Sequence, residues 1–403
     1  MTEPPTHATG GRSRDRIGLA LLAFAFTTVM LGTTLPTPIY ALYSDEMHFT
    51  VLTTTVIFST YAVGVLVALL VFGRWSDVVG RRPMLLLGAG FALASAVVFL
   101  FADDVPVLVV GRLLSGLSAG IFTGTATAAI VESAPADQRD RATAIATVAN
   151  IGGLGTGPLL AGALVQYAPD PLQLSFVVHI ALVALAIGAV LLTPETSGRT
   201  GRLGFQRLSV PVETRPIFVT AATAAFAGFA VTGLFMAVVP TFVKSVIGID
   251  NHFVAGIAAS SIFVASAIAQ PAARRIPSRQ AIAVGCAILI VGLAILALAL
   301  HFSSLPTLLV AAVVAGVGQG ISFSRGLAAV GESVPADQRA EVSSTYFVVA
   351  YVAIALPVIS EGFASQQLGM RTAGVSFTVV AAVLAALCLV AIIVQERRAP
   401  AKS

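Results

Sequence analysis

Four ionisable side chains stand inside long apolar stretches of this sequence, at Arg112, His179, Arg325 and Glu361. A charged group in such surroundings is costly, so it is kept where it has a partner, faces a water-filled cavity or relays protons. Removal from water favours the neutral form of a carboxyl group, so Glu361 is a candidate for binding and releasing a proton. His179 is a second, weaker candidate for the same chemistry.

Each of these residues also has a simpler interpretation. Arg112 and Arg325 lie near the ends of their stretches, so either side chain could extend to the membrane surface instead of facing a cavity. Glu361 could be a carboxylate exposed to water at the interface, and a lone histidine such as His179 is most often only hydrogen-bonded. Gln319 lies deeper in the same stretch as Arg325 and could offer a neutral polar contact.

The elements that carry these residues are about twelve apolar stretches separated by short polar loops. Hydrophobic residues make up 57% of the chain and charged residues 10%, whereas soluble domains carry about 25% charged residues. A run of roughly 20 apolar residues forms a helix long enough to cross a bilayer, and a helix satisfies its own backbone groups there. We therefore predict an all-α membrane protein with twelve transmembrane helices. The predicted spans are 17–41, 51–73, 84–102, 106–131, 141–167, 172–193, 216–243, 252–271, 281–301, 305–331, 341–365 and 372–394. The first is too long for a removable signal peptide.

Arginine and lysine predict the orientation of these spans, because positively charged loops stay in the cytoplasm. Nineteen of the 23 basic residues fall on one side. They are Arg12, Arg14, Arg16, Arg74, Arg81, Arg82, Arg139, Arg141, Arg199, Arg202, Arg207, Arg215, Arg274, Arg275, Arg279, Arg339, Arg397, Arg398 and Lys402. The other side receives Lys244 and Arg371. With an even number of spans, both termini are expected in the cytoplasm.

An internal repeat divides the chain into two halves. The segment ESAPADQR at residues 132–139 recurs as ESVPADQR at residues 332–339, with seven of eight positions identical at an offset of 200 residues. Each copy follows the fourth span of its half. We predict a cytoplasmic tail over 1–16, six-helix halves over 17–193 and 216–394, a cytoplasmic linker over 194–215 and a second tail over 395–403. Duplicated halves with a site between them are typical of secondary transporters.

The loop after the second span reads GRWSDVVGRR at residues 73–82. This segment resembles the cytoplasmic loop motif of the major facilitator superfamily, Gly-x-x-x-Asp-x-x-Gly-Arg-Arg/Lys. The matching positions are Gly73, Asp77, Gly80, Arg81 and Arg82. The resemblance implies the twelve-helix fold of that superfamily, with Asp77 packed near the start of the eleventh span as part of a latch between the halves. Without the resemblance, the loop is a basic connection with turn-forming glycines.

Two further residues of the predicted latch end spans 4 and 10. Glu132 and Glu332 stand at the cytoplasmic ends of these spans, where we expect them to pair with loop arginines.

Spans 4 and 5 carry two more family motifs. Arg112 and Gly116 match the fourth-helix pattern Arg-x-x-x-Gly, which implies a role for Arg112 in proton coupling or in recognising charge on the substrate. The segment 153–162 of span 5 resembles the antiporter motif Gly-Pro-x-x-Gly-Gly through three of its positions. These are Gly157, Pro158 and Gly162; Ala161 replaces the first glycine of the final pair. The motif is associated with exporters, although a packing kink at the proline is the alternative.

Candidate residues for the substrate cavity combine the polar positions above with one apolar wall. They are Arg112, Gln319, Arg325, Phe226, Phe229, Phe235 and Met236. The last four, all in span 7, could instead face lipid or a packed helix. The first span lacks the carboxylate found there in many proton-driven drug exporters, so a neutral or anionic amphiphile is at least as plausible as a cationic drug.

Other function classes lack support in the sequence. There is no phosphate-binding Gly-x-x-x-x-Gly-Lys-Ser/Thr loop and no cysteine–histidine cluster suited to zinc. Cys286 and Cys388 lie in apolar stretches, which predicts two buried thiols and no disulfide. We expect no enzyme activity, cofactor, metal or nucleic-acid partner.

The resemblance implies a transporter of the bacterial inner membrane that acts by alternating access. We expect a functional monomer that interacts with the lipid bilayer, a small-molecule substrate and protons. Proton-coupled efflux of small amphiphilic molecules is the predicted function. Proton-coupled or facilitated uptake of a sugar, organic acid or other metabolite is the alternative.

Overall fold

The computed structural model describes residues 9–335 and 338–398. Within these ranges the chain is helical and forms no strand, and twelve helices are long and apolar enough to cross a membrane. The N-terminal half contains α1 (Thr9–Thr34), α2 (Tyr40–Met47), α3 (Val51–Phe72), α4 (Trp75–Val78), α5 (Arg81–Leu100), α6 (Val105–Glu132), α7 (Arg139–Tyr167) and α8 (Leu174–Leu192). The C-terminal half contains α9 (Arg215–Ala237), α10 (Val239–Ser245), α11 (His252–Ala272), α12 (Ser278–Phe302), α13 (Leu305–Glu332), α14 (Arg339–Leu368) and α15 (Met370–Arg398).

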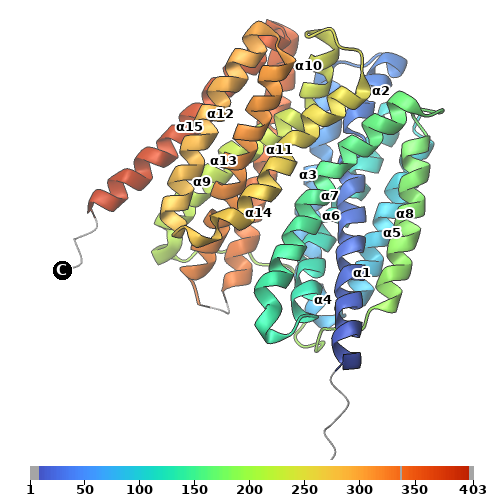
Figure 1. Cartoon of the computed structure of the whole chain (residues 1–403), viewed down its shortest axis with the longest axis vertical. Helices are drawn as coiled ribbons and strands as arrows, with labels where there is room; N and C mark the ends of the chain where they lie inside the picture. Colours follow the sequence, from blue (N-terminus) through green and yellow to red (C-terminus); the bar gives the residue numbers. More distant parts are fainter. Residues whose placement is uncertain (1–8, 336–337, 399–403) are drawn as a thin grey trace, which may run out of the picture.

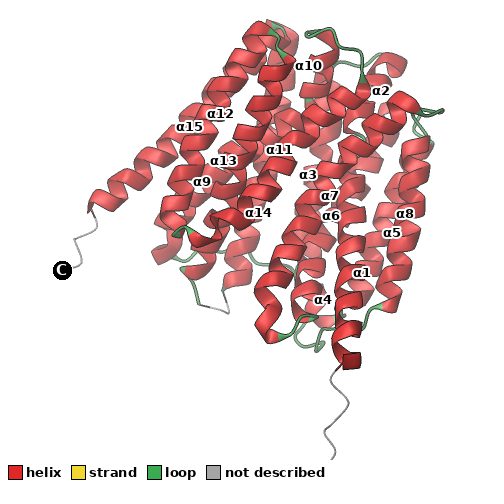
Figure 2. Ribbon diagram, in the orientation of Figure 1, coloured by secondary structure: helices red, strands yellow, loops and turns green. Residues whose placement is uncertain are grey.

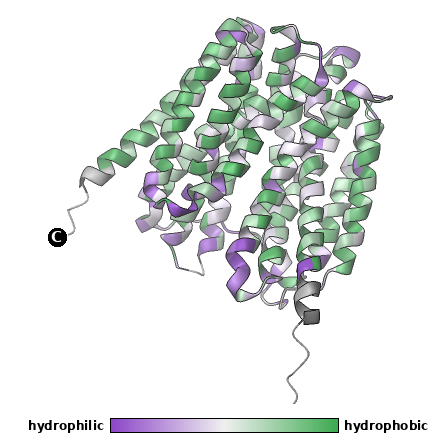
Figure 3. Ribbon diagram, viewed as in Figure 1, coloured by the Kyte–Doolittle hydropathy of each residue, from purple (hydrophilic) through white to green (hydrophobic). Residues whose placement is uncertain are grey.

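The two halves lie side by side, and the long helices run between two ends of the molecule (Figure 1). Loops gather at these ends (Figure 2), and hydrophilic residues concentrate there while the helix middles are hydrophobic (Figure 3). We name the end with the connections 73–80, 133–138, 193–214, 273–277 and 333–338 the arginine-rich end. The other is the opposite end.

The twelve predicted helices are confirmed, and the differences lie at their limits. The helix α1 begins at Thr9, before the predicted start of the first span, and α15 continues to Arg398. The helices therefore include part of both predicted tails, 1–16 and 395–403. Residues 1–8 and 399–403 lie outside the described part of the chain. The first and seventh spans are each interrupted, after Thr34 and at Val238, with prolines close by. Proline lacks the N–H that a continuous helix needs.

Side-chain caps start four of the helices that begin at the opposite end. Each capping oxygen accepts a hydrogen bond from the backbone N–H three residues later, which satisfies a donor that the helix itself leaves free. The caps are Thr50 on α3, Asp104 on α6, Asn251 on α11 and Ser304 on α13. Two of these capped helices, α3 and α11, each pack against a helix of the other half.

Close helix contact depends on glycine where backbones meet. A methyl group on Gly116 of α6 would lie 2.9 Å from the Cα of Gly64 on α3, which is too close for any side chain. The predicted packing role of Gly116 is thereby confirmed. The small residues let two helices of one half approach until their backbones touch.

The hydrophobic cores are arranged unequally along the molecule. One buried cluster joins residues of both halves, and all its members belong to the helix portions toward the opposite end. Toward the arginine-rich end, the buried residues of the N-terminal half form their own cluster, and those of the C-terminal half form a separate one. Packing therefore joins the halves chiefly at the opposite end.

Candidate functional site

Two helix pairs connect the halves. In the first, Gly256 of α11 faces the carbonyl of Pro158 on α7, and Gly162 of α7 faces the carbonyl of His252. In the second, Gly362 of α14 contacts the side chain of Thr55 on α3, and Ser59 Oγ donates a 3.3 Å hydrogen bond to the carbonyl of Ala355. Both pairs are tightest toward the opposite end.

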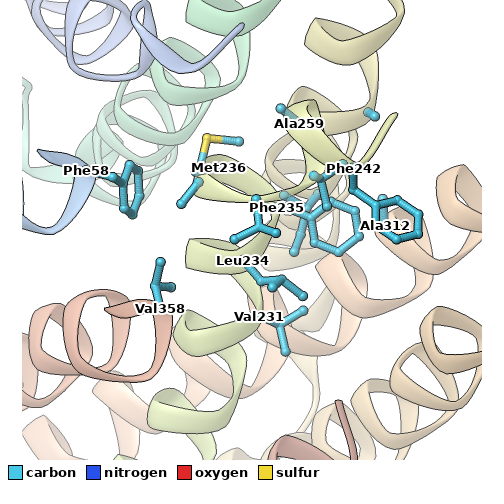
Figure 4. Close-up of a cluster of buried hydrophobic side chains, with 14 of the residues drawn as sticks. Phe58, Val231, Leu234, Phe235, Met236, Phe242, Ala259, Ala312 and Val358 are labelled. Atoms are coloured by element: carbon cyan, nitrogen blue, oxygen red, sulfur yellow. The ribbon is translucent and has the colours of Figure 1, made fainter. Parts of the chain in front are cut away.

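An apolar plug fills the space between these pairs. We define it by Phe58, Met236 and Val358, which are buried members of the shared cluster from α3, α9 and α14. Figure 4 shows Met236 between Phe58 and Phe235, with Val358 below Phe58 and Met236. Thr37 Oγ1 lies 3.8 Å from Met236 Sδ and adds a contact from the other half. The plug thus joins buried side chains of both halves at the opposite end.

Polar contacts surround the plug at the opposite end. Lys244 of α10 pairs with Asp45 of α2, and Gln366 Nε2 donates a 2.7 Å hydrogen bond to Thr50 Oγ1. The side chain of Gln166 accepts a 2.9 Å hydrogen bond from the backbone N–H of His252. Every one of these contacts crosses from one half to the other, so they must break before the opposite end can open.

Arg112 is enclosed by the N-terminal half, with 1% of its surface exposed. Its guanidinium donates to the carbonyls of Thr33 at 2.5 Å and Phe58 at 3.4 Å, and lies 5.3 Å and 4.8 Å from the ring centres of Phe58 and Tyr61. No carboxylate of the described residues pairs with it. Aromatic faces and carbonyl oxygens thus stabilise the cation. The alternative in which Arg112 extends to the membrane surface is excluded by this burial.

Glu361 is buried in α14, with 2% of its surface exposed. One carboxyl oxygen, Oε1, accepts a 2.9 Å hydrogen bond from Ser365 Oγ, while Oε2 has no partner among the described residues. The alternative of a water-exposed interfacial carboxylate is therefore wrong for this conformation. An apolar setting with one unsatisfied oxygen suits a carboxyl group that carries a proton.

His179 and the two polar residues of α13 occupy different places. The ring of His179 packs on Gly32 and shares a 3.3 Å hydrogen bond with the carbonyl of Thr28, so it joins α8 to α1 away from the interface of the halves. Gln319 Oε1 accepts a 2.8 Å hydrogen bond from Ser266 on α11. Arg325 Nη2 donates a 2.6 Å hydrogen bond to Ser278, the first residue of α12, and so points to the arginine-rich end.

The predicted apolar wall of α9 divides into two parts. Phe226 and Phe229 are half-buried, and the ring of Phe229 lies 4.8 Å from that of Phe323. Phe235 and Met236 are 0% and 1% exposed within the shared cluster, so neither lines an open cavity in this conformation. Their position near the break after α9 places them in the closed end instead.

Several residues of this region escaped the sequence prediction. Phe323 also lies 6.0 Å from the ring of Phe347, and Tyr61 meets Tyr351 across the halves at 6.3 Å. These aromatic residues lie on the arginine-rich side of the plug. A signal was present in the sequence, because tyrosine occurs only six times and all six positions fall within the candidate membrane spans.

The antiporter-type motif of α7 has a defined structural role. Pro158 lies inside the helix, so the carbonyl of Leu154 loses its usual intrahelical donor. Thr34 Oγ1, at the end of α1, donates a 2.8 Å hydrogen bond to that carbonyl. Gly157 packs against the same turn of α1, and Gly162 packs against the start of α11. The motif therefore brings three helices together on both sides of the interface.

The loop motif forms an ion-pair cluster within the N-terminal half. Arg81 pairs with Asp77 at 2.6 Å and with Glu132 at 2.8 Å. Among the described residues, Asp77 contacts Arg81 of this half and Ser197 of the linker. The expected contact with the start of α14 is not formed by the described residues in this conformation. Gly80 adopts a φ of 119°, which only glycine adopts readily.

The linker completes this cluster through Glu195, which the sequence prediction missed. Its carboxylate accepts hydrogen bonds from the backbone N–H groups of Arg81 at 2.7 Å and Arg82 at 3.1 Å, at the start of α5. Partial burial raises the pKa of Glu195, but these donors and the N–H of Ser197 outweigh it and hold that pKa below its ordinary value. In the C-terminal half, Glu332 has only Ser278 as a hydrogen-bond partner among the described residues. The polar cluster at the arginine-rich end is therefore extensive in the N-terminal half and small in the C-terminal half.

A family model decides the identity of this arrangement. The model described as Major Facilitator Superfamily matches residues 22–356 and again residues 290–403. The chain belongs to the Major Facilitator Superfamily. The predicted resemblance is confirmed, and with it a transporter fold of two pseudo-symmetric six-helix halves.

Individual relatives of this superfamily member match only part of the chain. It is 26% identical over 205 residues to multidrug resistance protein 1 of Bacillus subtilis, covering 49% of this chain and 52% of that protein. It is 28% identical over 195 residues to the tetracenomycin C resistance and export protein of Streptomyces glaucescens, covering 48% and 36%. The chain thus spans about half the length of the first relative and about a third of the second.

A solved structure supports the fold over the whole chain. A bacterial homologue of the human lysosomal transporter Spinster, in an inward-facing and unoccupied conformation, superimposes with a TM-score of 0.73 over 98% of this chain and 100% of that one. The sequence identity is 17%, so the match concerns the fold alone.

Proposed function

We propose that this transporter exports small amphiphilic molecules from the cytoplasm in exchange for protons, by alternating access. The observation that carries the proposal is the unequal packing of the halves. A plug and a polar rim close the opposite end, whereas the buried clusters toward the arginine-rich end are separate in the two halves. Two bundles joined at one end can rock so that the other end closes instead.

In this proposal the arginine-rich end faces the cytoplasm of a bacterium, both termini lie there, and the inner membrane surrounds the protein as a functional monomer. The charge asymmetry of the loops supports this orientation. The conformation described here would then accept substrate from the cytoplasm.

Glu361 is the proposed proton site. Its free oxygen lies in α14 close to Gly362, which touches α3 across the interface. A bare carboxylate is costly in this packed apolar setting, whereas the neutral acid is tolerated. Opening of the opposite end would separate α14 from α3 and admit water, so the proton would exchange in that state. Arg112 and His179 are then supporting residues that hold the N-terminal half together.

The proposed substrate site lies between the plug and the arginine-rich end. Phe229, Phe323, Phe347, Tyr61 and Tyr351 offer aromatic faces there. Aromatic faces suit flat apolar groups. Gln319 would supply a neutral polar contact. The spans carry no exposed carboxylate beside this wall among the described residues, which favours a neutral or anionic amphiphile over a cation.

The latch remains part of the proposal for the second state. When the arginine-rich end closes, the exposed carboxylate of Asp77 would meet the start of α14, where the N-terminal N–H groups of a helix attract an anion. Arg81, Arg82, Glu132, Gly73 and Gly80 would hold the loop in position for that contact, and Glu332 would close the other side.

Accumulation of a fluorescent amphiphile in expressing cells tests direction and coupling. For a proton-driven exporter, a protonophore should raise accumulation to the level of cells without the protein. The Glu361→Gln variant should show high accumulation with or without the protonophore, whereas Glu46→Gln, an exposed carboxylate at the opposite end, should behave as wild type. The residue Ala161, where the antiporter motif departs from glycine, keeps uptake as a second candidate. Lower accumulation after the protonophore would establish uptake and refute export.

A further inference from the structure

A basic cavity lies at the arginine-rich end of the N-terminal half, and its described lining residues all belong to that half. It has a volume of about 510 Å³ and lies between the start of α1, the connection after α6 and the start of α7. Arg16 and Arg141 line it together with apolar residues that include Leu19, Ala142 and Ile145. No acidic side chain lines it. We call this cavity the basic groove.

The two arginines of the basic groove have no acidic partner in the structure. Both side chains are exposed, and neither forms an ion pair or a side-chain hydrogen bond with any described residue. By contrast, Arg81 at the same end of the same half pairs with two carboxylates. The groove therefore presents two uncompensated guanidinium groups beside an apolar wall.

The internal repeat supplies a matched comparison. At the offset of 200 residues, the groove positions Ala142 and Ile145 correspond to Val342 and Thr345 of the C-terminal half. There the linker occupies the equivalent place. The N–H of Ser209 donates a 3.1 Å hydrogen bond to Thr345 Oγ1, and Val210 packs against the cluster that contains Val342.

The same comparison shows how the charge differs. Arg141 corresponds to Glu341, so an acidic residue replaces this basic one where the linker lies in the C-terminal half. Thr214 Oγ1 also bonds the carbonyl of Ser333 there at 3.3 Å, which adds a further contact to the filled site. The linker thus covers this place in the C-terminal half, whereas no described residue covers the basic groove of the N-terminal half.

We propose that the basic groove binds the phosphate headgroup of an anionic phospholipid, with an acyl chain along Leu19 and Ile145. Arg16 begins the first membrane span and Arg141 lies in the first turn of α7, which puts both at the level of the headgroups. Guanidinium groups bind phosphate through paired charge-assisted hydrogen bonds, and basic pockets between membrane helices suit anionic headgroups.

Native mass spectrometry of the full-length protein with phosphatidylglycerol or phosphatidylcholine tests the proposal. Phosphatidylglycerol should bind preferentially, and Arg16→Gln or Arg141→Gln should each weaken its affinity about fivefold. Arg279→Gln is the matched control, because Arg279 is exposed in the first turn of α12 at the same end but outside the groove, and its affinity should equal that of wild type. The rise in melting temperature on adding phosphatidylglycerol should rank the proteins in the same order as their affinities. The melting curves also report whether each variant is folded.

Three results would overturn the proposal. Equal loss of affinity in all three variants would show only a general attraction between a basic surface and anionic lipid. If inorganic phosphate alone protected the protein against thermal unfolding as well as phosphatidylglycerol does, the groove would be assigned to a soluble anion. An oxidative cross-link between Pro4→Cys and Gln138→Cys that phosphatidylglycerol leaves unchanged would show that the chain's own N-terminal residues cover the groove.

Discussion

Arg112 and Glu361 are both buried ionisable residues, but their surroundings give them different capacities. The guanidinium of Arg112 donates to two carbonyls and lies against two aromatic rings of its own half, and only its Nε has no partner among the described residues. Glu361 keeps an unsatisfied oxygen beside the interface with the other half. At the scale of single residues, we therefore propose that Arg112 stabilises the N-terminal half and that Glu361 is the group whose charge changes during transport.

Replacing Glu361 with glutamine should abolish proton-driven transport and leave folding and substrate binding intact. The amide keeps a hydrogen-bonding oxygen for Ser365 but cannot release a proton. The measurement is substrate flux in proteoliposomes as a function of pH, with binding measured separately. A variant whose transport retains the wild-type dependence on pH would exclude Glu361 as the coupling group.

The sequence predicted which residues are buried better than it predicted their partners. Apolar length gave the twelve spans, and the cost of charge in lipid singled out Arg112 and Glu361. The partners of Arg112 lie 79 and 54 positions away in the chain, on helices whose rotation is decided by packing. Nothing in the local pattern of α3 indicates that Tyr61 should face Arg112. The role of Glu195 was missed for the same reason, since it caps a helix 114 positions earlier.

At the scale of elements, α7 depends on a hydrogen bond that another helix donates to it. Pro158 removes the donor for the carbonyl of Leu154, and Thr34 of α1 replaces it. The kink and the contact between α1 and α7 are thus one feature. The linker acts similarly on α5, because Glu195 caps a helix start that has no side-chain cap of its own.

The Thr34→Val substitution should destabilise the protein by about 1 kcal/mol, the size typical of hydrogen bonds between membrane helices. The cost should fall sharply in a Pro158→Ala background, because alanine restores the N–H that the Leu154 carbonyl needs. Thermal or denaturant unfolding of the four proteins in one detergent measures this coupling. Equal costs in both backgrounds would show that Thr34 does not compensate for the proline.

Substituting Glu195 with glutamine should lower the melting temperature at pH 7 by about 1–3 °C. The pKa of Glu195 is lower in the folded protein than in the unfolded chain, so its stabilisation is present above the ordinary carboxyl pKa and disappears as the pH falls through the folded value. The difference from wild type should therefore shrink as the pH falls below the ordinary carboxyl pKa and vanish once Glu195 is protonated in the folded protein. Glu213→Gln, an exposed linker position, serves as control. A difference that persists at low pH would assign the effect to something other than charge.

At the scale of the whole molecule, the closed end is built like a protein interface with an apolar centre and a polar edge. The centre is Phe58, Met236 and Val358, and the edge includes the ion pair of Lys244 with Asp45. Such a seal holds the halves together and can still separate, because its polar groups can return to water. At the arginine-rich end the buried clusters of the two halves are separate, and fewer contacts cross between them, among them Phe347 of α14 and a hydrogen bond from Arg274 to the carbonyl of Asp140.

Reversing the charge at position 244 should weaken this seal. Lys244→Glu would face Asp45 and Asp250, and we expect the population open at the opposite end to rise about two- to fivefold, as for an exposed ion pair. Adding Asp45→Lys should reverse most of the effect. Labelling of a cysteine placed at Met236 by a membrane-impermeant reagent gives the readout. Equal labelling in wild type and both variants would mean that the pair does not hold the seal.

Paired distance measurements across the two ends test the central claim, that the halves rock about a shared seal. Spin labels would be placed at Gln138 and Arg279 for the arginine-rich end and at Asp103 and Ser303 for the opposite end, in a background without Cys286 and Cys388. On raising the pH, which ionises Glu361, or on addition of substrate, the account predicts a second population in which the distance at the opposite end lengthens and that at the arginine-rich end shortens. Distances that stay fixed at both ends, or change in the same direction, would contradict it.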